Sequence, residues 1–283
     1  MKFKKRLYVK NMRKLGDCMI SIDKDLIKNI VSNGKRLDNR EFNQYRDIII
    51  ETNIIPQAEG SARVKLGDTE VIAGVKLDIG EPFPDTGDEG MLMVGAEFVP
   101  LASEEFEPGP PNESSIELAR VVDRAIRESK CIDLKKLCIK ENEKVWCIFV
   151  DIDVLDHDGN LIDAATLAAT AALLNTKMLK LEKDGENYKV NYEQKTDEPL
   201  PMTKKPVNTT FVKIGDAILA DPSVQEEDAM DARLTVGTFE EDGETKFCSM
   251  QKGGNDGFTL EEIEKILDLA EEKGKELRKL LNF

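Results

Sequence analysis

The run KVWCIFVDIDVLDHDGNLIDAATLAATAALLN occupies residues 144–175 and joins a strand pattern to a helix pattern. It predicts a long strand over Lys144–Leu155, a turn at Asp158–Gly159 and a helix over Asp163–Asn175. The helix is rich in Ala and Leu and apolar on nearly every side, which is typical of a helix buried inside a protein. Cys147 lies within the apolar pattern of the strand, and we interpret it as a small core residue.

Strand and helix patterns continue upstream of this run. Gly67–Asp68 is a short turn that joins two strands into a hairpin. A helix is predicted from Ser114 or Ser115 to about Ser129. The predicted upstream strands are Arg46–Thr52, Ser61–Leu66, Thr69–Leu77 and Met91–Val99.

The downstream part repeats the order of strands followed by a helix. Leu179–Pro206 is polar and rich in turn residues, so it is interpreted as the connection between two halves. Two strands and a hairpin across Glu241–Gly243 follow it, and Thr259 forms a predicted capping box with Glu262 at the start of the last helix. The two strands are Thr209–Ile214 and Ala217–Ala220. This order predicts an α+β fold, with mixed sheets packed by helices.

The chain divides into a basic beginning and two larger units. Residues 1–20 carry lysines and arginines with no apolar segment behind them, so they are not a secretory signal. They are predicted to be a tail without ordered structure, or an over-extended start. Residues 21–180 and 205–283 are the predicted halves.

Smaller signals mark the entry into the first half. Ser21 can cap a short helix that ends at Gly34, because glycine suits the C-terminal cap of a helix. The following segment, Arg36–Arg40, is polar and is interpreted as a linker.

Composition limits the classes of function. The chain has 283 residues with 34% charged and 40% hydrophobic residues, which is typical of a globular protein. No apolar run approaches the roughly 20 residues that cross a bilayer. A formal net charge of -15 argues against a general nucleic-acid coat protein, although a local basic patch remains compatible with it. Five cysteines without a C-x-x-C pair predict neither disulfides nor a zinc site, and indicate a reducing cytoplasm.

Candidate anion and metal sites are weak. No P-loop motif occurs, and Gly253–Gly257 before the last helix is interpreted as a tight turn, with anion binding at the helix N-terminus as the alternative. The acidic residues of one segment could hold Mg²⁺ if their carboxylates converged, but a solvated acidic turn is the favoured interpretation. These residues are Asp221, Glu226, Glu227, Asp228 and Asp231.

Three arginines recur on the predicted helix that begins near Ser115. Arg120, Arg124 and Arg127 lie at spacings of four and three residues, which places them in one stripe together with Glu117. The opposite side carries Ile116, Ala119, Val122 and Ile126. A planar guanidinium binds two phosphate oxygens at once. Ion pairing within the helix is the alternative, as Glu117 with Arg120, Arg124 with Glu128 and Asp123 with Arg127, each worth about 0.2–0.5 kcal/mol. Spacing leaves both interpretations open.

Several long motifs resemble the RNase PH family. These are GSARVKLGDT at residues 60–69, ELARVVDRAIR at residues 117–127 and DGNLIDA at residues 158–164 before the Ala-rich helix. GEPFPDT at residues 80–86 and FEPGPP at residues 106–111 further resemble the non-catalytic ring subunit of the archaeal exosome. The resemblance covers roughly residues 30 to 275 in register.

This resemblance implies a fold of two similar βαβ-type halves and a hexameric ring. In such a ring this chain alternates with a catalytic RNase PH-like subunit, and RNA-binding cap subunits join the complex. The ring degrades single-stranded RNA from its 3′ end with inorganic phosphate as the attacking group. Mg²⁺ and phosphate are implied for the catalytic partner, and no cofactor is implied for this chain.

Three departures from the family pattern imply that this chain has no catalytic residues. Asn160-Leu161-Ile162-Asp163 stands where active members carry Gly-[Thr/Ser]-Arg-[Thr/Ser], so the phosphate-binding arginine is missing. Active members also carry two aspartates six residues apart; Asp228 matches the first, but Leu234 replaces the second and Asp231 is displaced. The acidic segment Ser103–Glu107 replaces basic residues.

The resemblance also assigns the arginine stripe. It implies that Arg120 and Arg124 lie at the interface with the catalytic partner and hold the RNA backbone. Arg127 is the third RNA-binding candidate, and its alternative is a pair with Asp123. Two other functions stay open: a self-sufficient phosphate-dependent exoribonuclease of the RNase PH class, and a protein of this fold that acts on an unrelated small molecule.

Overall fold

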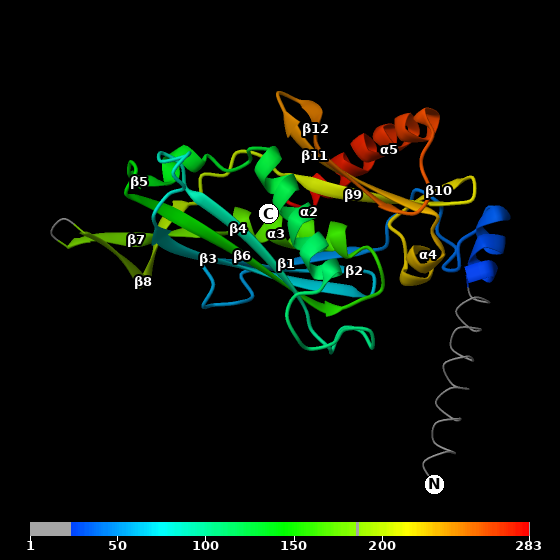
Figure 1. Cartoon of the computed structure of the whole chain (residues 1–283), viewed down its shortest axis with the longest axis horizontal. Coiled ribbons are helices and arrows are strands. Elements are labelled where there is room, and N and C mark those ends of the chain that lie inside the picture. Colours follow the sequence, from blue (N-terminus) through cyan, green and yellow to red (C-terminus); the bar gives the residue numbers. More distant parts are fainter. Residues whose placement is uncertain (1–23, 185–186, 283) are drawn as a thin grey trace, which may run out of the picture.

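The helix α3 (Leu161–Leu174) lies between two β-sheets (Figure 1). The computed structural model describes residues 24–184 and 187–282, so the predicted tail at residues 1–20 and the Ser21 cap lie outside the described residues. Twelve residues of α3 are buried, because the helix contacts strands of both sheets. The buried Ala-rich helix predicted from the sequence is confirmed, and it begins two residues earlier than predicted.

The first sheet is mixed. Its order is β1-β2-β3-β6-β4, with β5 also paired to β6, and only β4 runs parallel to its neighbour β6. The long strand predicted from Lys144 is its centre, and the hairpin at Gly67–Asp68 joins β2 to β3. The strands are β1 (Ile48–Thr52), β2 (Gly60–Leu66), β3 (Thr69–Gly80), β4 (Met91–Phe98), β5 (Cys138–Lys140) and β6 (Lys144–Asp156).

The second sheet has the order β10-β9-β11-β12 and is covered by the last helix, α5 (Leu260–Lys279). Every pairing in it is antiparallel, so the mixed character predicted for both sheets is wrong for this one. Short turns join β9 to β10 and β11 to β12, so these two pairs are antiparallel. Its strands are β9 (Val207–Ile214), β10 (Ala217–Ala220), β11 (Ala232–Glu241) and β12 (Glu244–Gly254). The α+β class itself is confirmed.

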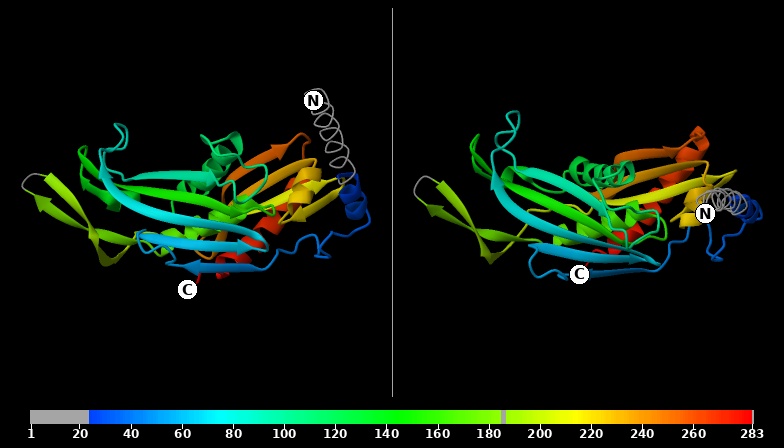
Figure 2. Two further views of the ribbon diagram at one scale, coloured as in Figure 1. Left: turned by 90° about the horizontal axis from the view of Figure 1, so that it is seen from below. Right: turned by 60° about the horizontal axis from the view of Figure 1, so that its bottom comes forward.

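The connection predicted over Leu179–Pro206 contains two strands that were not predicted from the sequence. Strands β7 (Lys177–Asp184) and β8 (Asn187–Pro199) form an antiparallel ribbon there. The ribbon extends from one end of the molecule in both views of Figure 2, which leaves most of its side chains exposed. Polar residues on both faces of a strand remove the alternation that normally reveals it.

Close packing of α3 on the first sheet depends on a small residue in β2. A Cβ atom at Gly60 would lie 2.3 Å from the carbonyl oxygen of Ala172. No side chain fits at that distance, so glycine is required where the strand crosses the end of the helix. Cys147 is buried in β6, as predicted for a core residue.

Capping residues set the helix ends. Gly34 ends the helix at residues 24–32 with a φ of 74°, which favours glycine. The capping box of Thr259 and Glu262 at the start of α5 is confirmed. The short helix α4 (Val224–Ala229) has a second capping box, formed by Ser223 and Glu226. Within residues 24–184 and 187–282, no helix has the length and apolarity needed to cross a membrane.

Arg36 is a buried residue and not part of a solvated linker, which corrects the prediction for Arg36–Arg40. Only 2% of it is exposed, and its guanidinium donates to both carboxylate oxygens of Glu226 at 2.8 and 2.5 Å. It also donates to the carbonyl oxygens of Ala220 and Asp221 at 2.9 and 2.7 Å. These bonds tie the segment ahead of the first sheet to the second sheet.

Replacement of Arg36 by Met tests this buried pair. The variant leaves the Glu226 carboxylate buried without its cation, so we expect the free energy of unfolding to fall by about 3–5 kcal/mol. The double variant Arg36→Met with Glu226→Leu removes both charges and should recover all but about 1–2 kcal/mol, the cost of the lost α4 cap. Urea denaturation followed by circular dichroism measures both, and equal losses in the two variants would contradict this account.

Candidate functional site

The helix α2 (Glu113–Glu128) carries the predicted arginine stripe. It begins at Glu113, one or two residues earlier than predicted, because the Asn112 side chain accepts a hydrogen bond from the Ser115 amide at 2.8 Å. One face packs into the core through Leu118, Val121, Val122, Ala125 and Ile126. Ile116, predicted on the buried side, is 48% exposed and lies on the arginine face.

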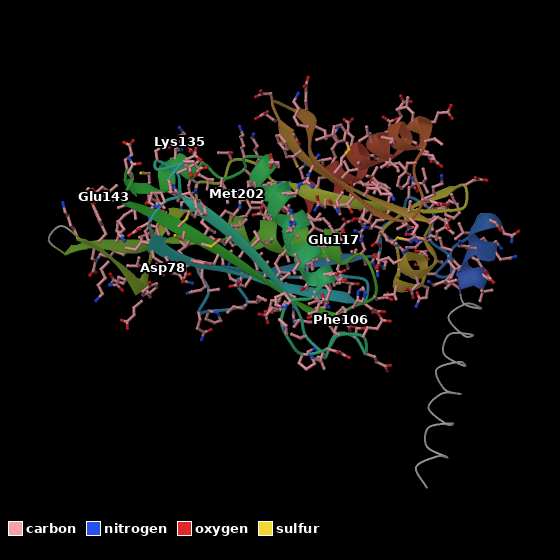
Figure 3. All side chains as sticks on the ribbon, in the orientation of Figure 1. Asp78, Phe106, Glu117, Lys135, Glu143 and Met202 are labelled. Atoms are coloured by element: carbon pink, nitrogen blue, oxygen red, sulfur yellow. The ribbon has the colours of Figure 1, made fainter. Side chains whose placement is uncertain are left out.

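Glu117 is engaged by the second sheet and not by Arg120. Its carboxylate accepts hydrogen bonds from Arg233 at 2.6 Å and from Gln251 at 3.3 Å (Glu117 is labelled in Figure 3). Arg233 lies on β11 and Gln251 on β12, so this contact fixes α2 against the edge of the sheet. The predicted pair of Glu117 with Arg120 is therefore wrong.

Arg120 and Arg124 are exposed, and neither has an ion pair with any residue in the described parts of the chain. Arg124 donates one long hydrogen bond, at 3.5 Å, to the Gln251 amide oxygen. The predicted ion pair of Arg124 with Glu128 is absent among the described residues. Both arginines border a cavity of about 410 Å³ with Ile116 and Gln251. Two guanidinium groups without carboxylate partners can bind phosphate oxygens.

Arg127 has a different environment. Its guanidinium donates to both carboxylate oxygens of Asp123 at 2.6 and 3.0 Å, and to the Leu92 carbonyl oxygen at 2.9 Å. The hydrogen bond to Asp123 raises the pKa of Arg127. The alternative predicted for this residue, a pair with Asp123, is thus present. Its donors face groups of the protein, unlike those of Arg120 and Arg124.

The N-terminus of α3 already holds carboxylates of the protein. The turn reverses at Gly159 and Asn160, whose φ angles of 87° and 54° are left-handed. The backbone amide of Asn160 donates to a carboxylate oxygen of Glu227 at 2.9 Å. A helix N-terminus attracts anions because its first amides lack partners within the helix. Glu227, from α4, occupies that position here, and burial raises its pKa to about 7.

Asp163 adds a second carboxylate in the first turn of α3. It is fully buried and accepts hydrogen bonds from the Tyr45 hydroxyl, the Asn160 amide group, and the amide and hydroxyl of Thr210, at 2.7–2.9 Å. Burial raises its pKa to about 6, although these hydrogen bonds act in the opposite direction. A phosphate bound at this turn would lie beside the carboxyl groups of Glu227 and Asp163, and residues 158–163 supply no arginine to bind it.

The acidic segment is largely internal, which corrects the prediction of a solvated acidic turn. Asp221 is buried and bound by Arg46, Glu226 is bound by Arg36, and Asp231 pairs with Lys28 at 2.7 Å. Of this set, Asp228 is exposed. Among the described residues no three His, Cys, Asp or Glu side chains converge in a way that could hold a metal ion. Spacing alone did not reveal these cationic partners, since they are 175 residues or more away in sequence.

An acidic loop lies close to the α3 turn. Phe106 stacks between Phe98 and His157, with ring centroids 4.5 and 5.4 Å apart (Phe106 is labelled in Figure 3). This stack pins the loop while its glutamates, Glu104, Glu105 and Glu107, remain exposed. Burial lowers the pKa of His157. The loop therefore presents negative charge beside the α3 turn.

The glycine segment before α5 ends strand β12 at Gly254 and continues as a bend at residues 255–256, which differs from the tight turn predicted over Gly253–Gly257. Gly254 has a φ of 78° and ends β12. The Glu262 amide of α5 donates to the Thr259 hydroxyl at 3.2 Å, and the first helical turn carries the carboxylates of Glu261 and Glu262. The alternative of an anion at this helix end is disfavoured, because these carboxylates already occupy its electropositive end.

The raised pKa values at α3 predict a pH-dependent stability. A carboxyl whose pKa is raised on folding contributes stability that is full below its unfolded pKa and lost as pH rises through its folded pKa. The free energy of unfolding should therefore decrease between pH 4.5 and 7.5, and Glu227→Gln should remove about 1–3 kcal/mol of that decrease. Denaturation at several pH values measures it. Asp228→Asn, an exposed neighbour, is the control, and parallel curves for wild type and Glu227→Gln would contradict the prediction.

Comparison with known proteins places this geometry in a family. Residues 44–178 match the 3′ exoribonuclease family, domain 1, and residues 205–273 match its domain 2. A protein of Methanothermobacter thermautotrophicus named "Exosome complex component Rrp42" is 47% identical over 94% of this chain and 96% of its own length. A protein of the same name from Thermococcus gammatolerans is 49% identical over 94% of this chain and 96% of its own length.

Solved structures agree with the sequence relatives. A chain of the "archaeoglobus fulgidus exosome with RNA bound to the active site" superposes with a TM-score of 0.84 and is 45% identical, covering 93% of this chain and 98% of that chain. A chain of an "Archaeal exosome core" gives a TM-score of 0.81 at 41% identity, covering 95% and 99%. The chain belongs to the RNase PH family of 3′ exoribonucleases, and its relatives there include archaeal exosome components.

Proposed function

We propose that this chain is a non-catalytic, RNA-binding and structural subunit of an exosome, a complex that degrades RNA from its 3′ end by phosphorolysis. It alternates with a catalytic RNase PH-like subunit in a hexameric ring, together with RNA-binding cap subunits, in the cytoplasm. The chain itself uses no cofactor, while its catalytic partner uses inorganic phosphate and Mg²⁺. The names of its relatives and its likeness to a chain of an RNA-bound exosome support membership of such a complex.

The observation that carries the non-catalytic part is the carboxylate at the N-terminus of α3. Phosphorolysis requires a bound phosphate, and this turn is where active members of the family hold it. Glu227 accepts from the Asn160 amide there, and buried Asp163 lies in the same helical turn. A phosphate dianion beside two carboxyl groups, with no arginine in the turn, is electrostatically unfavourable. The acidic loop at Glu104–Glu107 adds charge of the same sign.

The RNA-binding part of the proposal rests on Arg120 and Arg124. Their exposure and lack of carboxylate partners among the described residues leave most of their ten N–H donors available for backbone phosphates, since one donor of Arg124 is bound to the Gln251 amide oxygen. A chain of net charge -15 binds RNA through local cations. The cavity that the two arginines border also carries Glu113 and Glu117. Glu117 is paired with Arg233, so Arg120 and Arg124 are the cations that this lining offers. Arg127 is a weaker member of the set, since RNA must compete with Asp123 for it.

The alternative is a self-sufficient phosphate-dependent exoribonuclease. It needs a phosphate ligand set within this chain, and the two carboxylates at α3 oppose one. Activity of the purified chain alone therefore separates the two functions. If the chain alone releases nucleoside diphosphates, the account of α3 is wrong.

An RNA-shortening assay tests the proposal. A 5′-labelled single-stranded RNA is incubated with phosphate and Mg²⁺ and with this chain, a catalytic exosome ring subunit, or the mixture. We expect no shortening by this chain alone and clear shortening by the mixture. Arg120→Ala with Arg124→Ala should slow the mixture by about tenfold or more, because two charge-assisted phosphate contacts are lost.

The control carries the same change of charge elsewhere. Arg63→Ala with Lys65→Ala removes two half-exposed, ion-paired cations of β2, and it should change the rate by less than about twofold if backbone contacts are local. Size-exclusion chromatography must find each variant in complex with the catalytic subunit. Equal slowing by the two double variants would contradict a specific role for Arg120 and Arg124.

The single variant Arg127→Ala ranks the three arginines. Because its guanidinium is held by Asp123 and the Leu92 carbonyl, its loss should slow the mixture less than Arg120→Ala does. It should also lower the free energy of unfolding by about 0.3–0.5 kcal/mol, the worth of an exposed pair on a helix. Slowing as large as that of Arg120→Ala would place Arg127 among the main RNA contacts.

A further inference from the structure

A second cationic cavity lies at the C-terminal end of α5, beside the turn between β11 and β12 (these elements are labelled in Figure 1). Its volume is about 600 Å³. Five cations border it and only two acids, Glu240 and Asp242, so its lining carries a formal charge of +3 in a chain of net charge -15. The cations are Lys204, Lys205, Lys275, Arg278 and Lys279. None of these residues borders the cavity at Arg120 and Arg124.

Arg278 is the unusual member of this set. It is 94% buried, since only 6% of it is exposed, yet it has no ion pair with any residue in the described parts of the chain. Its guanidinium donates to the hydroxyl groups of Thr238 at 2.9 Å and Thr245 at 3.5 Å, and its Nε has no hydrogen-bond partner. Burial lowers the pKa of Arg278. A buried charge is costly unless an opposite charge compensates it.

Arg36 provides the comparison within the same protein. It is the other arginine with less than 9% exposure in the described residues, and the Glu226 carboxylate binds it through two oxygens. Arg278 has the same burial without such a carboxylate. Glu240 and Glu271 attract its charge from beyond ion-pair distance, so an anion from outside the chain can still approach the guanidinium, and the surrounding lysines favour one with several charges.

Helix electrostatics do not account for this burial. A cation near the C-terminus of a helix is favourable because the last carbonyl groups carry partial negative charge. Lys279, which is exposed in the same turn, meets that need without losing its hydration. The lysines differ in availability, because Lys204 and Lys275 pair with Glu241 and Glu271. Lys205 instead donates to the Asn282 side chain and the Leu281 carbonyl oxygen.

We propose that this cavity binds a phosphate-type oxyanion, with Arg278 as its fixed donor and Lys205 and Lys279 as the adjustable cations around it. The two guanidinium nitrogens that donate to Thr238 and Thr245 each carry a second N–H, which can donate to a phosphate oxygen, and the lysines can approach the remaining oxygens. The cavity is wide enough for pyrophosphate or a nucleotide. The same chemistry recognises a free phosphate compound or a phosphate of an RNA backbone.

Calorimetric titration of the full chain at low ionic strength tests the site. The probes are sodium pyrophosphate, inorganic phosphate and a short single-stranded RNA. We expect saturable binding of at least one probe, and Lys205→Ala with Lys279→Ala should weaken it by about fivefold or more because two charge-assisted contacts are lost. Arg278→Gln should weaken it further. Lys135→Ala with Lys136→Ala, an equal change of charge on exposed residues of η1 (Leu134–Leu137), should leave the affinity within about twofold.

The outcomes identify the source of the anion or overturn the site. If wild type binds pyrophosphate and the Lys205→Ala with Lys279→Ala variant does not, the ligand is a free phosphate compound. If wild type binds only the RNA and the variant loses that binding, the ligand is a backbone phosphate. Absence of binding by all three probes, or equal weakening by the control variant, overturns the proposal. Arg278→Lys keeps the charge and covers the case in which Arg278→Gln fails to fold. The test of this site can fail or succeed independently of the RNA-shortening assay, since the cavity shares no lining residue with the one at Arg120 and Arg124.

Discussion

Asp221 is fully buried at the junction of the two halves, and side chains from several segments donate to it. Arg40, Arg46 and Asn160 bind its two carboxylate oxygens at 2.7–2.9 Å. Burial alone would raise the pKa of Asp221, but the hydrogen bonds and charge of Arg46 lower it overall. Arg46 also binds Asp158 and the Gly159 carbonyl oxygen, so this one carboxylate fixes the turn that leads into α3. The position of α3 between the two sheets depends on it.

That constraint underlies the proposal of a subunit that binds RNA without a phosphate site of its own. Arg40 and Arg46, near the α3 turn, form ion pairs with Asp221. The first turn of α3 contains Asp163, and the Asn160 amide before it binds Glu227. On α2 the arrangement is reversed, because Glu117 binds Arg233 and leaves Arg120 and Arg124 for a ligand. In the proposed function, Arg120 and Arg124 bind RNA beside the catalytic partner, and the carboxyl groups at the α3 turn disfavour phosphate there. At the α3 turn and on the exposed face of α2, the ion pairs within the protein determine which charged groups remain available to a ligand.

The sequence predicted those parts of the fold whose signals are local. Alternation and turn residues gave β2, β3, β6 and β11 with their hairpins, and the apolar run at residues 163–174 gave the buried helix. The ribbon of β7 and β8 was missed because polar residues cover both of its faces. The buried pair of Arg36 with Glu226 and the contact of Glu227 with α3 were missed because they join residues that are distant in sequence. Periodicity placed Arg120 and Arg124 on one face, but only the three-dimensional contacts separate them from Arg127.

The most direct test of the central claim is whether phosphate binds at the N-terminus of α3. Inorganic phosphate is titrated into the isotopically labelled chain, and the backbone amide resonances of Asn160 and Leu161 are followed by NMR. We predict that these resonances do not move at near-neutral pH, because the Glu227 carboxylate already accepts from the Asn160 amide. Shifts confined to Arg278 and Lys279 would be compatible with this claim. A saturable shift of Asn160 and Leu161 would contradict it, because the chain would then bind the attacking group of phosphorolysis itself.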